Sequence, residues 1–399
     1  MSELTRRQAL RVLAALGVGG AAAPIMSACN SGSGQQESAT ANLAPVKIGL
    51  VVPQTGMYKT IGNDLNRGFE LYLNLNDKRL GGRSVNLVTL DEGDTADSGK
   101  AAVERLIKQE KVLALSGVAS STTMGAIRDL VETSQIPLIG SNASPTTLQG
   151  VRYIWRTSYV NDEPGKALGR YVASKVGNGS VALIAPDYQA GRDEIEGFLS
   201  MYGKNVEGLP IYTPFSPTPT MNFQPYLATI KNSRAKAVLC FYAGAQAVEF
   251  VKQYRQLGLN QDLYAPGFLT EGAVLREQGD AADKIYTSMN YSSDLDNDAN
   301  RRFASAYQKA YNAIPSAYAM ASYDAALVLD KALTTAGDGD ITPQGVNLAL
   351  GKIGSIDSPR GPWQFNQNRT PLQMWYLRQV RRDGGVWSNA VLSPLTTLG

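Results

Sequence analysis

The residues of this chain whose types and spacing could do chemistry are hydroxyls. The stretch "GVASSTTMG" (117–125) places Ser120, Ser121, Thr122 and Thr123 in a row, between a short apolar run and a segment with helical periodicity. Hydroxyls and the free N–H groups of a first helical turn attract a carboxylate or a phosphate. The same residues could instead only cap the helix. The row is therefore a candidate anion site.

The residues that the chain lacks narrow its chemistry further. It has no histidine, which excludes a His-based triad, a His general base and a His metal ligand. No nucleophile elbow of the G-x-S-x-G type occurs. The segment "GDTADSGKA" (93–101) has neither the spacing nor the Ser or Thr of a phosphate-binding P-loop. We therefore expect no enzyme activity and no cofactor.

An acidic segment, "DLDNDANRRFAS" (294–305), begins like a calcium-binding EF-hand loop. It has Ala299 where that loop needs glycine and Ser305 where it needs glutamate. We interpret it as a turn in which Asp296 or Asn297 caps the next helix. No metal site is expected.

The two cysteines have different contexts. Cys240 lies in the apolar run "AKAVLCFY", where a free cysteine behaves as a small hydrophobe. Cys29 follows a basic start, an uncharged run and two small residues, which is the layout of an export signal. That run is too short and too rich in Gly and Ala to persist as a membrane-spanning helix. No disulfide is possible within the mature chain if Cys29 carries lipid.

The segment around Cys29 predicts how the protein is anchored. "MSAC" resembles a bacterial lipobox, and the arginines of "TRRQALR" resemble a twin-arginine export motif. We expect residues 1–28 to be a signal peptide, Cys29 to carry the lipid, and residues 29–45 to form a flexible tether. The alternative is an ordinary secretory signal with an incidental cysteine.

Composition limits what the body of roughly 350 residues can be. It is long enough for two domains, and 43% hydrophobic content is sufficient for real cores. Residues 1–28 hold three of the 38 basic and one of the 35 acidic residues, so their removal leaves a net charge of +1. Neither a nucleic-acid partner nor a polybasic membrane surface is indicated.

Apolar runs alternate with amphipathic segments along this body. In the first half, β-branched runs at 47–52, 84–90, 112–117 and 136–141 are separated by helical patterns, which predicts a parallel sheet covered on both faces. The pattern then restarts with runs at 180–186, 208–214, 235–242 and 262–268. The sequence thus predicts two doubly wound α/β units. A hairpin of 361–365 with 373–382 is expected to close the chain.

Polar clusters follow many of the predicted strands. Open parallel sheets bind ligands in the crevice beyond the carboxyl ends of their strands. The clusters that we expect at this crevice are "PQTGMYKT" (53–60), "GVASSTTMG" (117–125), "GSNASPTT" (140–147), "PDYQAG" (186–191), "CFYAGAQ" (240–246) and "PGFLTEG" (266–272).

The chain resembles, along essentially its whole length, the substrate-binding proteins of branched-chain amino acid type ABC importers, most of all a branch associated in part with aromatic and other carboxylic acids. Five segments carry the resemblance by their order: "VVPQTGMYKTIGNDLNRGFELYLN", "GVASSTTMGAIRDLVETSQIPLIGSNASPTTL", "LIAPDYQAGRDEIEGF", "FYAGAQAVEFVKQYRQLGL" and "SPRGPWQFNQNRTPLQMWYLRQV". It implies the type I periplasmic-binding fold, in which two lobes joined by three crossovers close on a ligand. It also implies lobe 1 at 46–159 plus 290–361 and lobe 2 at 160–289 plus 362–399, with hinges near 158–162, 286–292 and 358–364.

The resemblance also implies the residues of the ligand site. The expected contacts from lobe 1 are Tyr58, Ser120, Ser121, Thr122, Asn142, Ala143 and Ser144, and those from lobe 2 are Tyr188, Gln189 and Tyr242. Amino-acid binders of the family hold the ligand ammonium with an acidic residue, but the matching position here is Gly267. Glu271 could substitute, although its place at a predicted helix start is equally explained by the helix dipole.

These observations predict an exported, lipid-anchored, monomeric protein without catalytic activity. It would capture a small carboxylate, either a branched-chain amino acid or an aromatic or keto acid, on the outer face of a bacterial cell membrane. Its partners would be an ABC permease and ATPase, with membrane contact through the lipid alone. The alternative is a sensing protein on the same fold that reports its ligand to a receptor.

Overall fold

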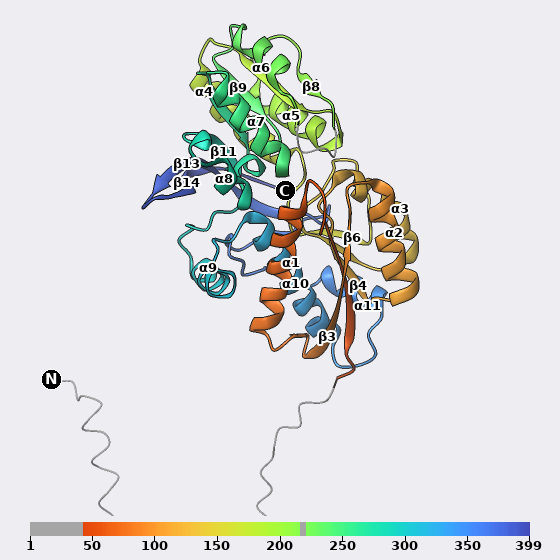
Figure 1. Cartoon of the computed structure of the whole chain (residues 1–399). Coiled ribbons are helices and arrows are strands. Elements are labelled where there is room, and N and C mark those ends of the chain that lie inside the picture. The colour runs from red at the N-terminus through yellow and green to blue at the C-terminus, as the bar shows by residue number, and fades with distance from the viewer. Residues whose placement is uncertain (1–42, 216–220) are drawn as a thin grey trace, which may run out of the picture. The chain divides into compact units, whose positions relative to one another are not determined.

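The computed structural model describes residues 43–215 and 221–399. They form two α/β lobes, each built on its own sheet (Figure 1). The predicted signal peptide, the predicted lipidation site Cys29 and most of the predicted tether lie outside the described residues.

Lobe 1 has a six-stranded sheet in the order β2-β3-β1-β4-β5-β6. All neighbours in it are parallel except β2 and β3. The strands predicted in the first half are present as β1, β3, β4 and β5. The bounds are β1 (Val46–Val52), β2 (Arg79–Leu80), β3 (Arg83–Asp91), β4 (Ala114–Gly117), β5 (Leu138–Gly140) and β6 (Ile154–Arg156).

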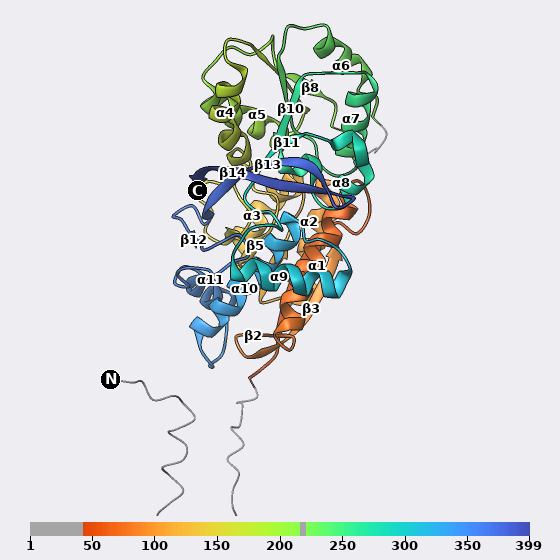
Figure 2. The same ribbon diagram turned by 90° about the vertical axis from the view of Figure 1, so that its left-hand side faces the viewer.

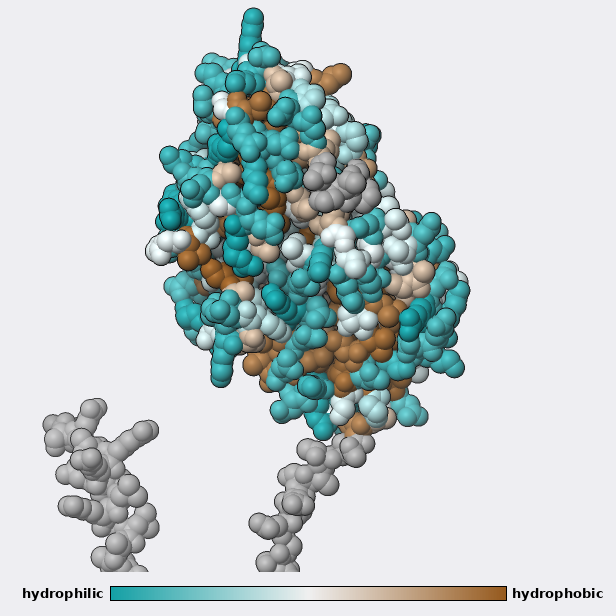
Figure 3. Space-filling model, in the orientation of Figure 1, coloured by the Kyte–Doolittle hydropathy of each residue, from teal (hydrophilic) through white to brown (hydrophobic). Residues whose placement is uncertain are grey.

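Helices cover both faces of this sheet, as predicted. Helices α1 and α10 lie against each other on one face and α2 and α3 on the other (Figure 1). Apolar side chains gather over lobe 1 near α1 and β3 on the face in Figure 3, where β3 is only half-buried. The bounds are α1 (Lys59–Leu75), α2 (Ala96–Arg105, followed by a π-helical turn Leu106–Glu110), α3 (Ser121–Ser134), α9 (Asp298–Tyr311), α10 (Ala317–Ala336) and α11 (Pro343–Leu350).

Lobe 2 has, within the described residues, an eight-stranded sheet in the order β12-β13-β11-β10-β9-β7-β8, with β14 paired to β13. The strands β7 to β10 are parallel as predicted, and β11 is parallel to β10. In contrast, β13 is antiparallel to β11, and β12 and β14 are antiparallel to β13. The bounds are β7 (Val181–Pro186), β8 (Ile211–Thr213), β9 (Ala237–Cys240), β10 (Asp262–Pro266), β11 (Tyr286–Met289), β12 (Gln364–Phe365), β13 (Pro371–Asp383) and β14 (Val386–Leu398).

Strands β13 and β14 at the edge of lobe 2 are joined by a tight hairpin, a connection that only antiparallel strands can use. The sequence indicated the pairing of β12 with β13 but not the long strand β14. Both views place the β13–β14 hairpin at the level where the two lobes meet (Figure 1 and Figure 2).

The helices of lobe 2 also lie on both faces of their sheet. Helices α4 and α5 pack together on one face, whereas α6 and α7 shield an apolar core on the other. None of the helices in residues 43–215 and 221–399 combines the length and apolarity that crossing a bilayer requires. The bounds are α4 (Glu163–Val176), α5 (Gln189–Tyr202), α6 (Gln224–Lys231), α7 (Gly244–Gln256) and α8 (Ala273–Gln278), with 3₁₀ turns at Gly267–Thr270 and Gly279–Ala282.

Local sequence signals explain where several helices begin. Asn297 accepts a hydrogen bond from the N–H of Asn300 and caps α9, which confirms the interpretation of the acidic segment as a capped turn. Gly117 ends β4 with a positive φ of 106°, and a Cβ there would lie 2.1 Å from the carbonyl oxygen of Val51. Only glycine fits this turn, which leads from β4 toward the first residue of α3.

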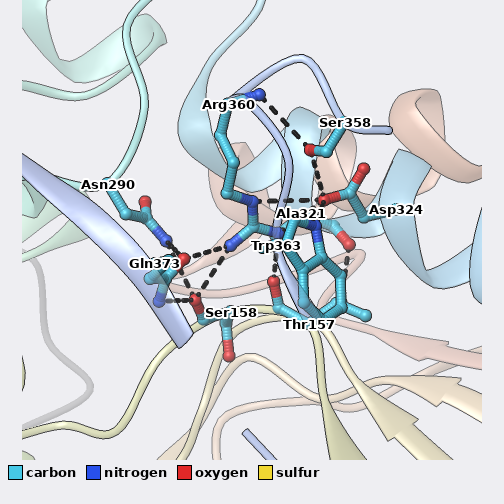
Figure 4. Close-up of polar contacts among 9 residues, drawn as sticks. All are labelled: Thr157, Ser158, Asn290, Ala321, Asp324, Ser358, Arg360, Trp363 and Gln373. Carbon is cyan, nitrogen blue, oxygen red and sulfur yellow. Dashed lines mark hydrogen bonds and ion pairs between the residues drawn. The ribbon is translucent and has the colours of Figure 1, made fainter. Parts of the chain in front are cut away.

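The chain crosses between the lobes three times, after β6, after β11 and before β13. Arg360, in the third crossover, pairs with Asp324 of α10, with Nη2 and Oδ2 2.6 Å apart. It also donates to the carbonyl oxygens of Thr157 and Ser158 in the first crossover and to Gln373 of β13. Figure 4 shows its guanidinium between Asp324 on one side and Gln373 and Ser158 on the other.

The second crossover joins the same network through Asn290. Its Nδ2 donates to the carbonyl oxygen of Ser158 at 2.9 Å and to Oε1 of Gln373 at 2.8 Å (Figure 4). Trp363 and Ser358 donate to the Asp324 carboxylate as well. The three crossovers therefore meet in one buried polar network, which we call the hinge network.

Replacing Arg360 with methionine should lower the free energy of unfolding by about 3–5 kcal/mol, because Asp324 would stay buried without its partner. Urea unfolding measures this change. The matched control is Arg302→Met, because Arg302 and Asp357 form a pair whose side chains are 70% and 78% exposed. That variant should lose less than about 1 kcal/mol. Equal losses in both variants would contradict the importance of the buried pair.

Candidate functional site

A pocket lies between the two lobes, where the carboxyl ends of both sheets face each other. Strands β1, β4, β5, β7, β9 and β10 each deliver a following residue to its wall, as expected for a crevice at the strand ends. The lining residues are Tyr58, Ile61, Ala119, Ser121, Asn142, Ala143 and Tyr318 from lobe 1, Tyr159 and Asn161 from the first crossover, and Tyr188, Ala190, Glu194, Phe241, Ala243 and Phe268 from lobe 2.

Aromatic rings form much of this wall. Phe268 lies at the centre of the group, with its ring centroid 5.1 Å from that of Tyr159, 6.0 Å from that of Phe241 and 6.1 Å from that of Tyr318. Tyr188 extends the row beyond Phe241, at 6.3 Å. Both lobes and a crossover thus contribute to one aromatic surface.

Ser121 lies on the lobe 1 side of the cavity, at the first position of α3. Its Oγ accepts a hydrogen bond of 3.0 Å from Nδ2 of Asn161, which leaves its hydroxyl hydrogen available to a ligand. No described residue accepts a hydrogen bond from the backbone N–H of Ser121 or Thr122, as is usual in a first helical turn. This end of the cavity therefore offers donors and the positive end of a helix dipole.

The two backbone N–H groups just before Ser121 are already hydrogen-bonded within the protein, which the sequence did not indicate. The buried carboxyl of Glu92, one residue after β3, accepts hydrogen bonds from the N–H of Ala119 at 2.7 Å and that of Ser120 at 2.9 Å. Burial raises the pKa of Glu92 to about 7, although these bonds act in the opposite direction. An internal carboxyl thus holds the loop before α3, and only the N–H groups further along face a ligand.

Asn142 is fixed from both sides. Its Nδ2 donates to the carbonyl oxygen of Ala119 at 2.8 Å, and its Oδ1 accepts from the hydroxyl of Tyr159 at 3.0 Å. The Tyr159 ring is thereby oriented across the cavity. Ala143, the next residue, also lines the wall, and its small side chain leaves room for a ligand.

The cavity is poor in charge. Its lining, as far as the structure describes it, includes no Lys or Arg and one carboxyl group, that of Glu194. Burial raises the pKa of the Tyr58 hydroxyl to about 12, and it raises the pKa of Tyr159 and of Tyr188 well above the usual range. The three phenols are therefore neutral hydrogen-bonding groups. Residues 43–215 and 221–399 contain no cluster of acidic or thiol side chains suited to a metal ion.

Of the eleven predicted ligand contacts, five line the cavity together: Tyr58, Ser121, Asn142, Ala143 and Tyr188. The other predicted lobe 1 contacts do not. The Ser120 N–H is bound to Glu92, and the Thr122 side chain is exposed on α3. Ser144 lies buried behind the wall, where its N–H donates to Oδ1 of Asn161 at 3.1 Å.

Two lobe 2 residues also lie elsewhere than expected. Gln189 is exposed and donates to Asp193 at 2.7 Å. Tyr242 is fully buried on the α6 and α7 side of the sheet, stacked on Phe250, with its hydroxyl 3.1 Å from that of Thr213. Successive residues at a strand end point to opposite faces, so Phe241 faces the cavity in its place.

Glu271 does not line the cavity either. Its Oε2 accepts from Arg378 at 2.8 Å, and its Oε1 accepts from the N–H of Ala317, the first residue of α10, at 2.8 Å. This carboxylate joins the lobes outside the ligand cavity. A Cβ on Gly267 would lie 2.4 Å from the Arg378 guanidinium, so the usual position of an acidic partner is occupied.

The two lobes also contact each other directly beside the cavity, as in a closed arrangement. Asp193 of α5 accepts hydrogen bonds from Thr146 of lobe 1, at 2.7 Å from its hydroxyl and 3.2 Å from its N–H. The hydroxyls of Tyr58 and Tyr188 lie 3.3 Å apart across the cleft. Ligand entry therefore requires these contacts to open.

Several cavity residues were not among the predicted contacts: Tyr159, Asn161, Glu194 and Tyr318. Phe241 and Phe268 were not named either, although their segments 240–246 and 266–272 were expected at the crevice. The alternation of side chains along a strand could have indicated Phe241 rather than Tyr242 as the cavity residue. Glu194 lies four residues after Ala190 on α5, so the two share one helix face, but an acidic residue in a helix is normally read as exposed. Tyr159 and Tyr318 come from a crossover and from α10, which only the three-dimensional arrangement brings together.

The chain was compared with known families and proteins. The family described as "Periplasmic binding protein" matches residues 45–385. The "Leu/Ile/Val-binding protein homolog 6" of Brucella melitensis is 27% identical over 359 residues, which cover 86% of this chain and 90% of the relative.

Two solved structures have the same fold and a moderate identity. A solute binding protein of an ABC transporter from R. palustris, solved in complex with benzoate, is 30% identical with a TM-score of 0.81, covering 88% of this chain and 97% of its own. A solute binding protein of an ABC transporter from Rhodopseudomonas palustris HaA2, solved with p-hydroxybenzoic acid, is 26% identical with a TM-score of 0.81, covering 88% and 96%.

Proposed function

Because the chain belongs to the periplasmic binding protein family, we propose that it is the solute-binding component of an ABC importer that captures a small aromatic carboxylate and delivers it to the permease. The observation that carries the ligand class is the closed cavity itself. Six aromatic side chains from both lobes and the first crossover surround it, and no cationic side chain lines it within the described residues. The protein is a solute-binding protein of the ABC transporter type rather than an enzyme.

The proposed carboxylate position is the lobe 1 end of the cavity. The hydroxyl of Ser121 and the N–H groups of the first turn of α3 are donors aimed at this end. Hydrogen bonds from such groups to an ionised acceptor are shorter and stronger than those between neutral groups. They can therefore hold a carboxylate without a Lys or Arg.

The proposed ring position is the aromatic surface around Phe268. Offset and edge-to-face ring contacts contribute about 0.5–1.5 kcal/mol beyond the burial of apolar area. A ligand with an aromatic ring can make such contacts with both lobes at once. The structures solved with benzoate and p-hydroxybenzoic acid support this ligand class.

A branched-chain amino acid fits less well. Its ammonium would need a buried acidic partner, and an unpaired ammonium in a closed site costs several kcal/mol. Glu271 is already bound to Arg378, and Gly267 has no side chain. Glu194 is the one carboxyl in the described lining, and burial raises its pKa well above the usual range, which favours the uncharged acid over the carboxylate that an ammonium needs.

Transport follows from a shift between open and closed states. A ligand that touches lobe 1 and lobe 2 at once does so only when the lobes are closed, so it stabilises that state. The contact between Asp193 and Thr146 forms only then as well. We propose that the permease reads this closed form of a monomeric binding protein and that the ATPase powers import.

Replacing Ser121 with alanine should weaken the binding of 4-hydroxybenzoate by about 10- to 150-fold, because a bond to a charged group contributes about 1.5–3 kcal/mol. Isothermal titration calorimetry with ligand-free protein measures the affinity. Thr122→Ala is the matched control, since the Thr122 hydroxyl is next in sequence but exposed. It should change the affinity by less than about 2-fold. Equal effects in both variants would exclude the proposed carboxylate position.

We also propose that the protein is exported and held at the outer face of the cell membrane by a lipid on Cys29, a residue outside the described part. Cys29→Ser should then fold normally but leave the membrane fraction, because the segment that follows it has the Ser, Gly and Gln composition of a flexible tether. Detergent partitioning of the variant and the unchanged protein in cells that process lipoproteins tests this. Continued membrane partitioning of Cys29→Ser would contradict the lipid anchor.

A further inference from the structure

Glu194 is a buried acid in the cavity with a side chain only partly hydrogen-bonded. It lies on α5, is 2% exposed and lines the cavity on the lobe 2 side. Its Oε2 accepts a hydrogen bond of 3.0 Å from the N–H of Gly165. No described residue forms a hydrogen bond with Oε1. Buried polar atoms are normally paired, so a free carboxyl oxygen in a ligand cavity needs an explanation.

The surroundings of Glu194 are acidic and aromatic. Glu163 accepts from the N–H of Val160, and Asp162 is paired with Lys166. Asp193 is satisfied by hydrogen bonds from its neighbours, and the cavity side presents the neutral phenols of Tyr159 and Tyr188. None of these groups offers Glu194 a free cation.

The proton on Glu194 follows from this environment. Burial raises the pKa of Glu194 well above its usual range, and the charges of Asp162, Asp193 and Glu163 raise it further. These effects favour the protonated carboxyl. With the Gly165 N–H bound to Oε2, the acid hydrogen belongs on Oε1, the oxygen that no described residue binds.

Resting on the proposed function, we propose that Glu194 selects for a hydroxyl group on the ligand ring, from the lobe 2 side of the cavity. A hydroxyl can both accept and donate, so it pairs with the carboxyl through Oε1 in either protonation state. Unsubstituted benzoate would leave that oxygen buried without a partner, which is unfavourable. The carboxylate is thus read by lobe 1 and the hydroxyl by lobe 2.

Calorimetric titration of benzoate and 4-hydroxybenzoate tests the assignment, since the two ligands differ only in the hydroxyl. The wild-type protein should bind 4-hydroxybenzoate about 5- to 50-fold more tightly. In Glu194→Leu this preference should fall to within about 2-fold, while benzoate binds at least as tightly as before. Glu194→Gln should keep a clear preference, because its amide oxygen can accept from Gly165 and its amide nitrogen faces the ligand.

The matched control is Glu196→Leu, because Glu196 lies on the same helix but is exposed. It should keep the wild-type preference. A preference that persists in Glu194→Leu would overturn the assignment of the hydroxyl to Glu194. Thermal unfolding of each ligand-free variant identifies any variant that fails to fold. If Glu194→Leu does not fold, Glu194→Gln carries the test, and its preference for 4-hydroxybenzoate over benzoate should be smaller than that of the wild-type protein.

Leucine is titrated in parallel, in two buffers with different enthalpies of ionisation. Tight leucine binding with release of a proton, abolished in Glu194→Leu, would assign Glu194 to an ammonium and overturn the hydroxyl proposal. Absence of binding of both aromatic acids to the wild-type protein would instead overturn the proposed function itself. The two failures can be told apart, because the first requires that leucine binds and the second requires that neither aromatic acid binds.

Discussion

The buried pair of Arg360 and Asp324 is the interaction on which the arrangement of the two lobes depends. Both side chains are almost fully buried, so each would be very unfavourable without the other. The guanidinium also binds carbonyl oxygens of the first crossover and the side chain of Gln373. Backbone groups in a crossover have few strand or helix partners, and here a charged side chain supplies them. The pair therefore defines where the chain can bend between lobes.

The hinge network also affects the position of residues in the cavity wall. Tyr159 directly follows Ser158, whose carbonyl oxygen accepts from Arg360, Asn290 and Gln373. The tyrosine hydroxyl is bound in turn to Asn142 of lobe 1, and its ring touches Phe268 of lobe 2. The hinge network thus places one aromatic wall of the ligand site. The hinge network and the ligand site are connected through the adjacent residues Ser158 and Tyr159. A change in the position of the lobes therefore also changes the ligand contacts.

The sequence predicted the fold well because its signals are local. Apolar runs indicated the strands β1 to β10 apart from the short β2 and β6. Strand ends placed the segments 117–125 and 140–147 at the crevice, and the family resemblance pointed to Ser121, Asn142 and Ala143 within them. The prediction from sequence was wrong where the position of a side chain depends on packing. Phe241 and Tyr242 directly follow β9, and which of the two reaches the ligand depends on the face of the sheet to which each side chain points. Glu194 is acidic on an amphipathic helix, a position normally exposed.

The central claim is that the lobes close around a small aromatic carboxylate. Small-angle X-ray scattering of protein stripped of ligand by unfolding and refolding tests it most directly. Saturating 4-hydroxybenzoate should reduce the radius of gyration and bring the scattering curve to that calculated for the closed arrangement of residues 43–215 and 221–399, and saturating leucine should not. A curve that stays unchanged with the aromatic acid, or that contracts with leucine alone, would contradict the account.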